Sequence, residues 1–125
     1  MLTLHTEGEG IALTLTAQSM GRDWNVTITG GEVPHLGAAA LGAPYRHPDG
    51  RVGSSASVLV LPSHKEDGVV KKAAEQLAKR LNCAVLVSGG IHVDAITPEQ
   101  IGAVVTLAGE AVERLARQME LEQKP

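Results

Sequence analysis

The first third of the chain shows hydrophobic and polar residues in alternation. Apolar residues at positions 11, 13 and 15 alternate with Ala and Thr, and those at 24, 26 and 28 alternate with Asn and Thr. Such alternation is typical of strands with one buried face. The segment 19–23, which contains Gly21, suits a hairpin connection. We therefore predict two antiparallel strands, from Ile11 to Thr16 and from Trp24 to Thr29.

The middle of the chain is less regular. The segment from Leu36 to Leu41 is small and apolar, and its pattern fits more than one type of element. A turn is predicted at Pro48-Asp49-Gly50, because these residues favour turn geometry. The following segment, from Val52 to Leu61, ends in four consecutive apolar residues. A continuous apolar run predicts a strand at the centre of a sheet.

The second half of the chain reads as helix, strand and helix. Apolar residues recur at helical spacing from Val69 to Leu81, after a capping-box pattern formed by Ser63 and Glu66. Asn82 is suited to end this helix, because it tolerates a left-handed conformation. A short buried strand is predicted from Ala84 to Val87.

The last helix has a clear start. Thr97 is the predicted N-cap, Pro98 suits the first helical position, and Gln100 completes a capping box. An apolar stripe runs from Ile101 to Met119. The polar residues 120–125 are predicted to form a frayed, disordered tail.

Together these elements predict one α+β domain over residues 1–125. The domain is a two-layer structure, with an antiparallel-rich sheet covered on one face by two main helices. The other face carries Thr, Ser and Ala and is expected to contact water or a partner. A symmetric homodimer through this face or through a helix is expected at this size.

Composition excludes several classes of function. The chain has 125 residues, with 11 Lys and Arg against 14 Asp and Glu, one Trp, one Tyr and no Phe. Nucleic-acid and anionic-membrane binding require clustered basic residues, and binding of single strands relies on aromatic stacking. Cys83 precedes an apolar run and is predicted to be a buried, inert thiol. We expect a soluble, cytoplasmic protein, because long apolar stretches and a signal-peptide pattern are absent.

Three histidine-containing motifs each follow a predicted strand. Loops at strand ends concentrate binding residues, because a rigid scaffold positions them. Strand ends that precede helix starts often lie at one edge of a sheet, so we expect the motifs to form a shared site. The candidate residues are Gly30, Gly31, His35, Gly37, His64, Lys65, Glu66, Gly90, His92 and Asp94.

The residue types in these motifs favour a phosphate-bearing small molecule. Glycine pairs allow close approach of a ligand, while helix starts and Lys65 attract phosphate. A metal is the competing interpretation, with ligands from His35, His64, His92 and Asp94. In a strand, His92 and Asp94 would share a face, which also suits acid–base chemistry. The simplest alternative is structural, since such residues commonly cap helices and form turns.

The chain resembles the LpdD-like proteins, the small D subunits of gallate and hydroxybenzoate-type non-oxidative decarboxylase systems. The resemblance extends from about residue 7 to residue 118. Three motifs in the same order carry it: Gly30-Gly31-x-x-Pro34-His35-Leu36-Gly37, His64-Lys65-Glu66-Asp67 and Gly90-Ile91-His92-Val93-Asp94-x-Ile96-Thr97.

The resemblance implies an accessory protein rather than an independent enzyme. The family's fold is similar to that of small proteasome-assembly chaperones, which form dimers. The implied function is to bind prenylated FMN, or FMN, and to deliver it to, or mature it in, the large subunit of a UbiD-type decarboxylase. The ten candidate residues would then contact the cofactor, with Lys65 at the phosphate. Only Trp24 and Tyr45 are available for aromatic stacking on the flavin.

Two other classes of function remain open. A protein-only assembly chaperone would bind a large partner and retain no cofactor. A small metalloenzyme built on the histidines would contain stoichiometric metal.

Overall fold

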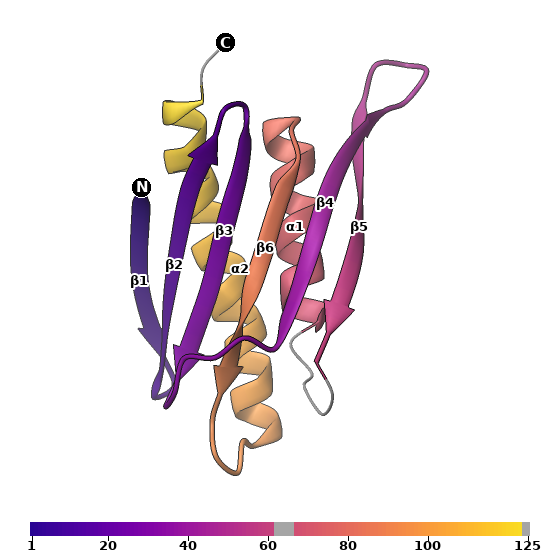
Figure 1. The fold of residues 1–125 in the computed structure, drawn as a ribbon. Helices are drawn as coiled ribbons and strands as arrows, with labels where there is room; N and C mark the ends of the chain where they lie inside the picture. Colours follow the sequence, from indigo (N-terminus) through magenta and orange to yellow (C-terminus); the bar gives the residue numbers. More distant parts are fainter. Residues whose placement is uncertain (62–66, 124–125) are drawn as a thin grey trace.

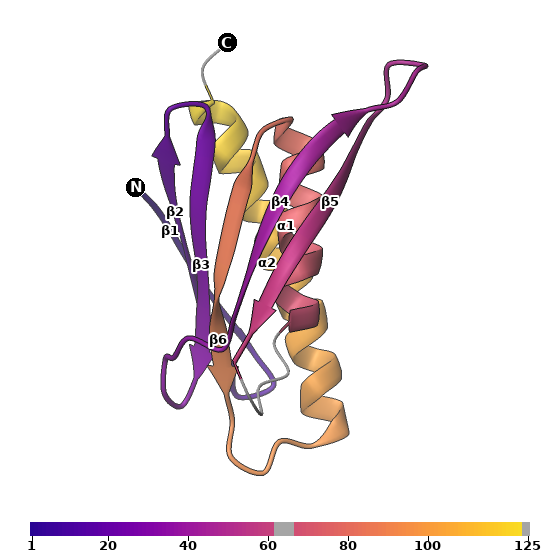
Figure 2. The same ribbon diagram turned by 45° about the vertical axis from the view of Figure 1, so that its right-hand side comes forward.

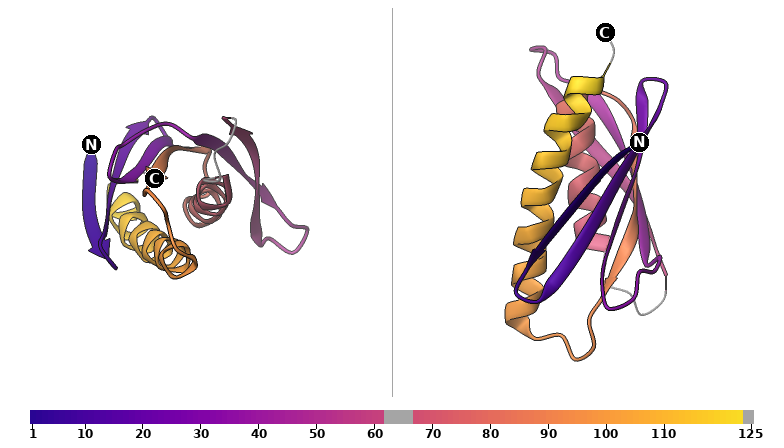
Figure 3. Two further views of the ribbon diagram at one scale, coloured as in Figure 1. Left: turned by 90° about the horizontal axis from the view of Figure 1, so that it is seen from below. Right: turned by 90° about the vertical axis from the view of Figure 1, so that its left-hand side faces the viewer.

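The structure is a computed structural model that describes residues 1–61 and 67–123. It has two layers, a six-stranded sheet and two helices that cover the same face (Figure 1 and Figure 3, left). The α+β architecture predicted from the sequence is therefore confirmed. The elements are β1 (Leu2–Gly8), β2 (Ile11–Met20), β3 (Asp23–Gly31), β4 (Ala38–Arg46), β5 (Val52–Val60), α1 (Asp67–Leu81), β6 (Val85–His92) and α2 (Pro98–Glu122).

The order of the strands in the sheet is β1-β2-β3-β6-β4-β5. Strand β6 lies between β3 and β4, parallel to β3 and antiparallel to β4 (Figure 2). Because β4 is antiparallel to both β5 and β6, these two strands run in the same direction. Helix α1 connects them across β4, and this crossover places β6 in the middle of the sheet.

One strand prediction requires correction, and one strand was not predicted. The Val52–Leu61 segment was predicted to be central, but β5 is an edge strand, and the side chain of Leu59 is 78% exposed. An apolar run therefore did not determine the order of strands, because the α1 crossover gives the central position to β6. The N-terminal residues, including His5, form β1, which pairs with β2 and was not predicted.

The core lies between the sheet and the helices. The predicted alternation is confirmed, because Ile11, Leu13 and Leu15 of β2 are almost completely buried, as are the apolar residues of β3. Leu77 and Leu115 contribute fully buried side chains from the helices. Burial of such side chains is the main source of stability for a domain of this size.

The helix ends follow their sequence signals. The backbone N–H of Gln100 donates to Thr97 Oγ1 at 3.1 Å, and the Thr97 N–H donates to Gln100 Oε1 at 3.0 Å, which confirms the capping box. Asn82 has φ of 53° and ends α1 as predicted. The Ser63 and Glu66 capping box lies outside the described residues. The tail predicted over residues 120–125 begins later than expected, because α2 continues to Glu122, and residues 124–125 lie outside the described residues.

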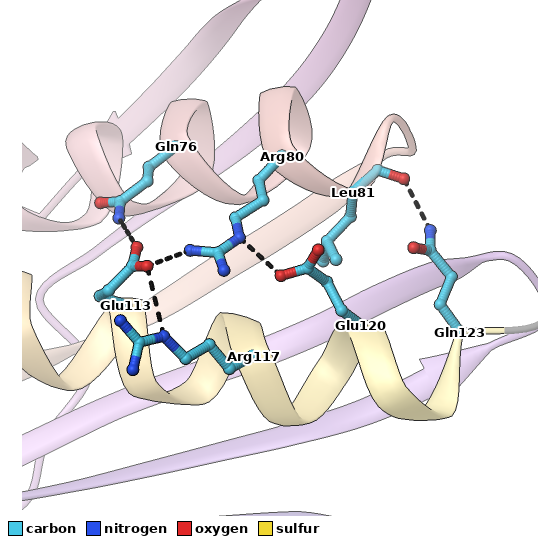
Figure 4. Close-up of polar contacts among 7 residues, drawn as sticks. All are labelled: Gln76, Arg80, Leu81, Glu113, Arg117, Glu120 and Gln123. Atoms are coloured by element: carbon cyan, nitrogen blue, oxygen red, sulfur yellow. Dashed lines mark hydrogen bonds and ion pairs between the residues drawn. The ribbon is translucent and has the colours of Figure 1, made fainter.

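Polar contacts join the C-terminal halves of α1 and α2 (Figure 4). The Arg80 guanidinium pairs with the carboxylates of Glu113 and, at 2.7 Å, Glu120. Gln76 Nε2 donates to Glu113 Oε2 at 3.3 Å, and Gln123 Nε2 donates to the Leu81 carbonyl oxygen at 2.6 Å. These contacts explain why the last turn of α2 remains helical. We call this set of residues the polar clamp.

Among the helices of the described residues, none combines the length and apolar character needed to cross a membrane.

Candidate functional site

The first and third predicted motifs meet where β3 and β6 end, at the lower end of the sheet in Figure 1. Gly31 is paired with His92 in the parallel register, and the Glu32 N–H donates to the His92 carbonyl oxygen at 2.7 Å. Gly31 has φ of 78°, and a Cβ there would lie 1.9 Å from the same oxygen. Glycine is therefore required for the two strand ends to come this close.

A polar group lies at these strand ends. Glu32, His92 and Asp94, here called the edge cluster, place their ligand atoms within 4.8 Å of one another. His92 Nε2 lies 2.8 Å from Asp94 Oδ1, and the Asp94 N–H donates to Glu32 Oε1 at 3.3 Å. The pKa of Asp94 lies below its ordinary value, mainly because its carboxylate is hydrogen-bonded to His92. One imidazole and two carboxylates are a ligand set that can hold a divalent transition metal.

Glu32 was not among the predicted site residues. It directly follows Gly31 in the first motif, and that position is the signal that would have identified it. The predicted proximity of His92 and Asp94 holds. However, Asp94 lies in a turn beyond β6 rather than in the strand.

His35 lies beside the edge cluster. A Cβ on Gly90 would lie 2.6 Å from His35 Nε2, so the absence of a side chain at Gly90 makes room for the imidazole ring. The rings of His35 and His92 are edge-on, with centroids 6.0 Å apart. The structure therefore brings together five predicted residues, namely Gly31, His35, Gly90, His92 and Asp94.

The other predicted residues are placed differently. Gly30 faces the core, because a Cβ there would lie 2.4 Å from Leu13 Cδ2. The Gly37 N–H donates to the Gly89 carbonyl oxygen at 2.9 Å, and the Gly37 carbonyl oxygen accepts from the Leu61 N–H at 2.9 Å. Gly37 thus links β4, β5 and β6 at the same end of the sheet. His64, Lys65 and Glu66 lie outside the described residues.

The sequence analysis missed a groove between the N-terminal halves of α1 and α2. This aliphatic groove has a volume of about 330 Å³ and lies on the helix-covered side of the sheet. It reaches the β6–α2 connection at Ile91 and Ile96, so it begins close in sequence to His92 and Asp94. The groove-lining residues were assigned to apolar helix faces, and nothing in their spacing indicates that the two helices separate here.

Comparisons with known proteins agree with this architecture. A family model for the prenylated flavin chaperone LpdD-like domain matches residues 7–120. The chain is 28% identical over 118 residues to Protein LpdD of Lactiplantibacillus plantarum, covering 88% of this chain and 79% of that protein.

A solved structure shares the fold. It is a chain of a chaperone complex for yeast 20S proteasome assembly, with a TM-score of 0.62 and 12% sequence identity. The match covers 98% of this chain and 96% of the other. At this identity the likeness concerns the fold alone. The family match over most of the chain shows that this protein belongs to the LpdD-like family of prenylated flavin chaperones.

Proposed function

We propose that the protein binds prenylated FMN and delivers it to, or helps mature it in, a UbiD-type aromatic acid decarboxylase. In this role it acts as an accessory subunit in the cytoplasm and has no catalytic residues of its own. The observation that carries the proposal is that the first and third motifs meet at one end of the sheet, where strands β3 and β6 terminate. Membership of the prenylated flavin chaperone family supplies the class of ligand.

The edge cluster suits the uncharged polar parts of a flavin. The carboxylates of Glu32 and Asp94 accept hydrogen bonds from N–H and hydroxyl groups. The imidazoles of His35 and His92 can each donate one hydrogen bond and accept another. Two neighbouring carboxylates repel a phosphate. The cluster is therefore assigned to the polar edge of the ring or to the ribityl chain. The phosphate is assigned to basic residues outside the cluster; Lys65, which the sequence predicts for this role, lies outside the described residues.

Aromatic stacking does not contribute at this edge. Trp24 is buried in the core, with 4% of its surface exposed. Tyr45 is seven residues along β4 from Ala38, which corresponds to about 23 Å of extended strand. The ring must accordingly be covered by aliphatic side chains or by a partner.

The second part of the proposal is a homodimer through the open face of the sheet. Leu41, Leu59 and Leu86 lie on this face, with 52%, 78% and 37% of their surfaces exposed. Leu41 is paired with both Ser57 and Leu86, so the leucines lie on neighbouring strands. No charged residue of the described β4, β5 and β6 strands projects from this part of the face. An apolar, uncharged patch suits a self-complementary interface.

The flavin proposal is tested by anaerobic titration with reduced prenylated FMN and, in parallel, with plain FMN. We expect stoichiometric binding that prefers the prenylated form. The His35→Ala and His92→Ala variants, and the double variant with His64→Ala and Lys65→Ala, should weaken binding at least tenfold, or about 1.4 kcal/mol. The matched control is His5→Ala, since His5 lies in the edge strand β1.

Delivery is tested separately by mixing the loaded protein with a purified UbiD-type apo-decarboxylase and measuring decarboxylation. Absence of binding to either flavin would contradict the cofactor proposal and favour a protein-only assembly chaperone. Stoichiometric metal in the purified protein, lost in Glu32→Gln and Asp94→Asn, would instead favour a metalloenzyme.

The dimer is tested by sedimentation of the wild-type protein and the Leu41→Arg variant. We expect the wild type to sediment as a dimer and the variant as a folded monomer. Leu121→Arg is the control, because Leu121 is exposed on the last turn of α2. A wild-type monomer would contradict the proposal.

A further inference from the structure

We infer that the aliphatic groove between α1 and α2 holds the ring system of the prenylated flavin, with the phosphate beyond Lys72 on the other side of α1. This inference rests on the proposed function and assigns to the ligand a binding surface that the sequence motifs do not include. Three features of the described residues support it: the lining of the groove, its volume and its basic neighbour.

The lining of the groove is almost entirely aliphatic. Val69 and Ala73 of α1 face Val105 and Ala108 of α2, while Ile91 and Ile96 lie at the sheet end. Ile96, Ile101 and Val105 expose 39%, 52% and 47% of their surfaces, although each is a large apolar residue. Burial of this surface by a flat apolar ligand is favourable, at about 25 cal/mol per Å² of apolar area.

The groove lies between the helices where small residues face each other, and the polar clamp, which includes the groove-lining Gln76, joins the helices beyond it. Ala73, Ala108 and Gly109 leave space between the helices that larger side chains would fill. The resulting volume of about 330 Å³ is at the lower end of the range of roughly 300–1,000 Å³ for small-molecule sites. It suits a fused ring system with an added hydrocarbon ring, while the ribityl phosphate extends outside.

Charge complementarity indicates where the phosphate lies. Lys72 and Gln76 of α1 line the groove and also line a shallow hollow on the other side of the helix. This hollow adds Lys79 and Arg51, whose Nε pairs with Asp49 Oδ2 at 2.7 Å, and it also includes the carboxylate of Glu75. A ligand that crosses α1 at Lys72 thus places an apolar ring in the groove and an anionic group among basic side chains. Lysine and arginine side chains both bind phosphate.

The opposite end of the groove lies at Ile96 in the β6–α2 connection, two residues beyond Asp94. Ile91 faces the groove from β6, so the next side chain, His92, projects from the open face of the sheet. A ring bound in the groove can direct one edge toward this connection and its phosphate toward Lys72.

The groove is tested with a pair of glycine variants in α2. A Cβ at Gly109 or at Gly102 has no atom within 4 Å, so a leucine is accommodated in the fold at either position. Gly109 lines the groove, whereas Gly102 lines a different hollow beside the β1–β2 turn. Gly109→Leu should weaken binding of reduced prenylated FMN at least tenfold. Gly102→Leu should bind like the wild-type protein.

The basic end is tested with Lys72→Met, with Lys71→Met as the matched control one residue away. Lys72→Met should weaken binding of prenylated FMN about tenfold and leave binding of the dephosphorylated prenylated riboflavin unchanged. Methyl NMR spectra provide a second readout, in which the ligand should shift the resonances of Val69, Val105 and Ile96.

The outcomes separate this inference from the proposed function. Wild-type binding that persists unchanged in Gly109→Leu would overturn the groove and leave the cofactor-chaperone proposal intact. Equal loss in Gly109→Leu and Gly102→Leu, with intact circular dichroism, would also overturn it. Absence of wild-type binding to either flavin would overturn both proposals.

Discussion

The two halves of the α1–α2 pair have opposite character. In the C-terminal halves, the polar clamp joins the helices above a core that includes the completely buried Leu115 (Figure 4). In the N-terminal halves, the helices separate around the aliphatic groove. The two helices run in the same direction, so both groove-lining halves lie at the end of the sheet where β3 and β6 terminate (Figure 1). The polar clamp thus lies toward one end of the molecule, while the aliphatic groove and the edge cluster lie toward the other.

The strongest test of this comparison is a pair of truncations in α2. Leu115→Ala should lower the free energy of unfolding by about 2–5 kcal/mol, because it leaves a cavity in the closed half. Ile101→Ala should cost less than about 1 kcal/mol, because Ile101 is half exposed in the groove. Urea unfolding measures both values. Similar losses for the two variants would show that the two halves do not differ in packing.

Thiol reactivity gives a second test at the closed end. Cys83 follows α1 and is 6% exposed, and burial, with a smaller contribution from Asp23, raises the pKa of its thiol from 9.0 to about 11. A thiol pKa of about 11 in place of 9.0 lowers the thiolate fraction at pH 8 about 100-fold, so native Cys83 should react about 100-fold more slowly than the unfolded chain. Ellman's reagent measures this rate.

A cysteine moved to the groove provides the contrast. In a Cys83→Ala, Val105→Cys variant, the new thiol should react at a rate close to that of the unfolded chain, because Val105 is 47% exposed. Slow labelling at Val105 would mean that the groove is closed in solution.

The smallest expected effect concerns the pH dependence of the polar clamp. The pKa of Glu113 lies below its ordinary value of 4.5, mainly because its carboxylate is hydrogen-bonded to Arg80. A depressed carboxyl pKa contributes stability above the ordinary value, and this contribution is lost as the pH falls through the lower, folded-state pKa. Wild-type protein should therefore lose more stability than Glu113→Gln between pH 5 and strongly acidic pH.

This prediction is checked by thermal unfolding across that pH range. The difference between the two proteins should be smaller than the effect of Leu115→Ala, because the clamp is exposed to solvent and salt. Parallel acid profiles for the two proteins would show that the clamp does not stabilise the closed half.

Local signals in the sequence predicted the elements best where they act within a few residues. The capping box at Thr97 and the left-handed Asn82 are both present, since each depends on hydrogen bonds or sterics of one turn. Alternation in β2 and β3 correctly identified the buried face. The start of the C-terminal tail was predicted too early, because contacts from Arg80 and Leu81, about forty residues away in the sequence, hold the last turn of α2.

The candidate site was predictable in part. His35, Gly90, His92 and Asp94 are brought together, since two of the motifs follow strands that end side by side. Glu32 and the groove escaped prediction. Glu32 comes close to His92 and Asp94 only because Gly31 pairs with His92 across two strands. The groove exists only because of the spacing between two helices, which the sequence pattern does not specify.

By itself, the sequence determined the α+β class, the buried faces of β2 and β3, the helix caps and the positions of the motifs along the chain. Only the tertiary structure decided that β6 is central, that β5 is an edge strand and that α1 and α2 separate at one end. The physical reason is the range of the interactions. Caps and alternation arise from neighbouring residues, whereas strand order and helix spacing depend on how distant segments share one core.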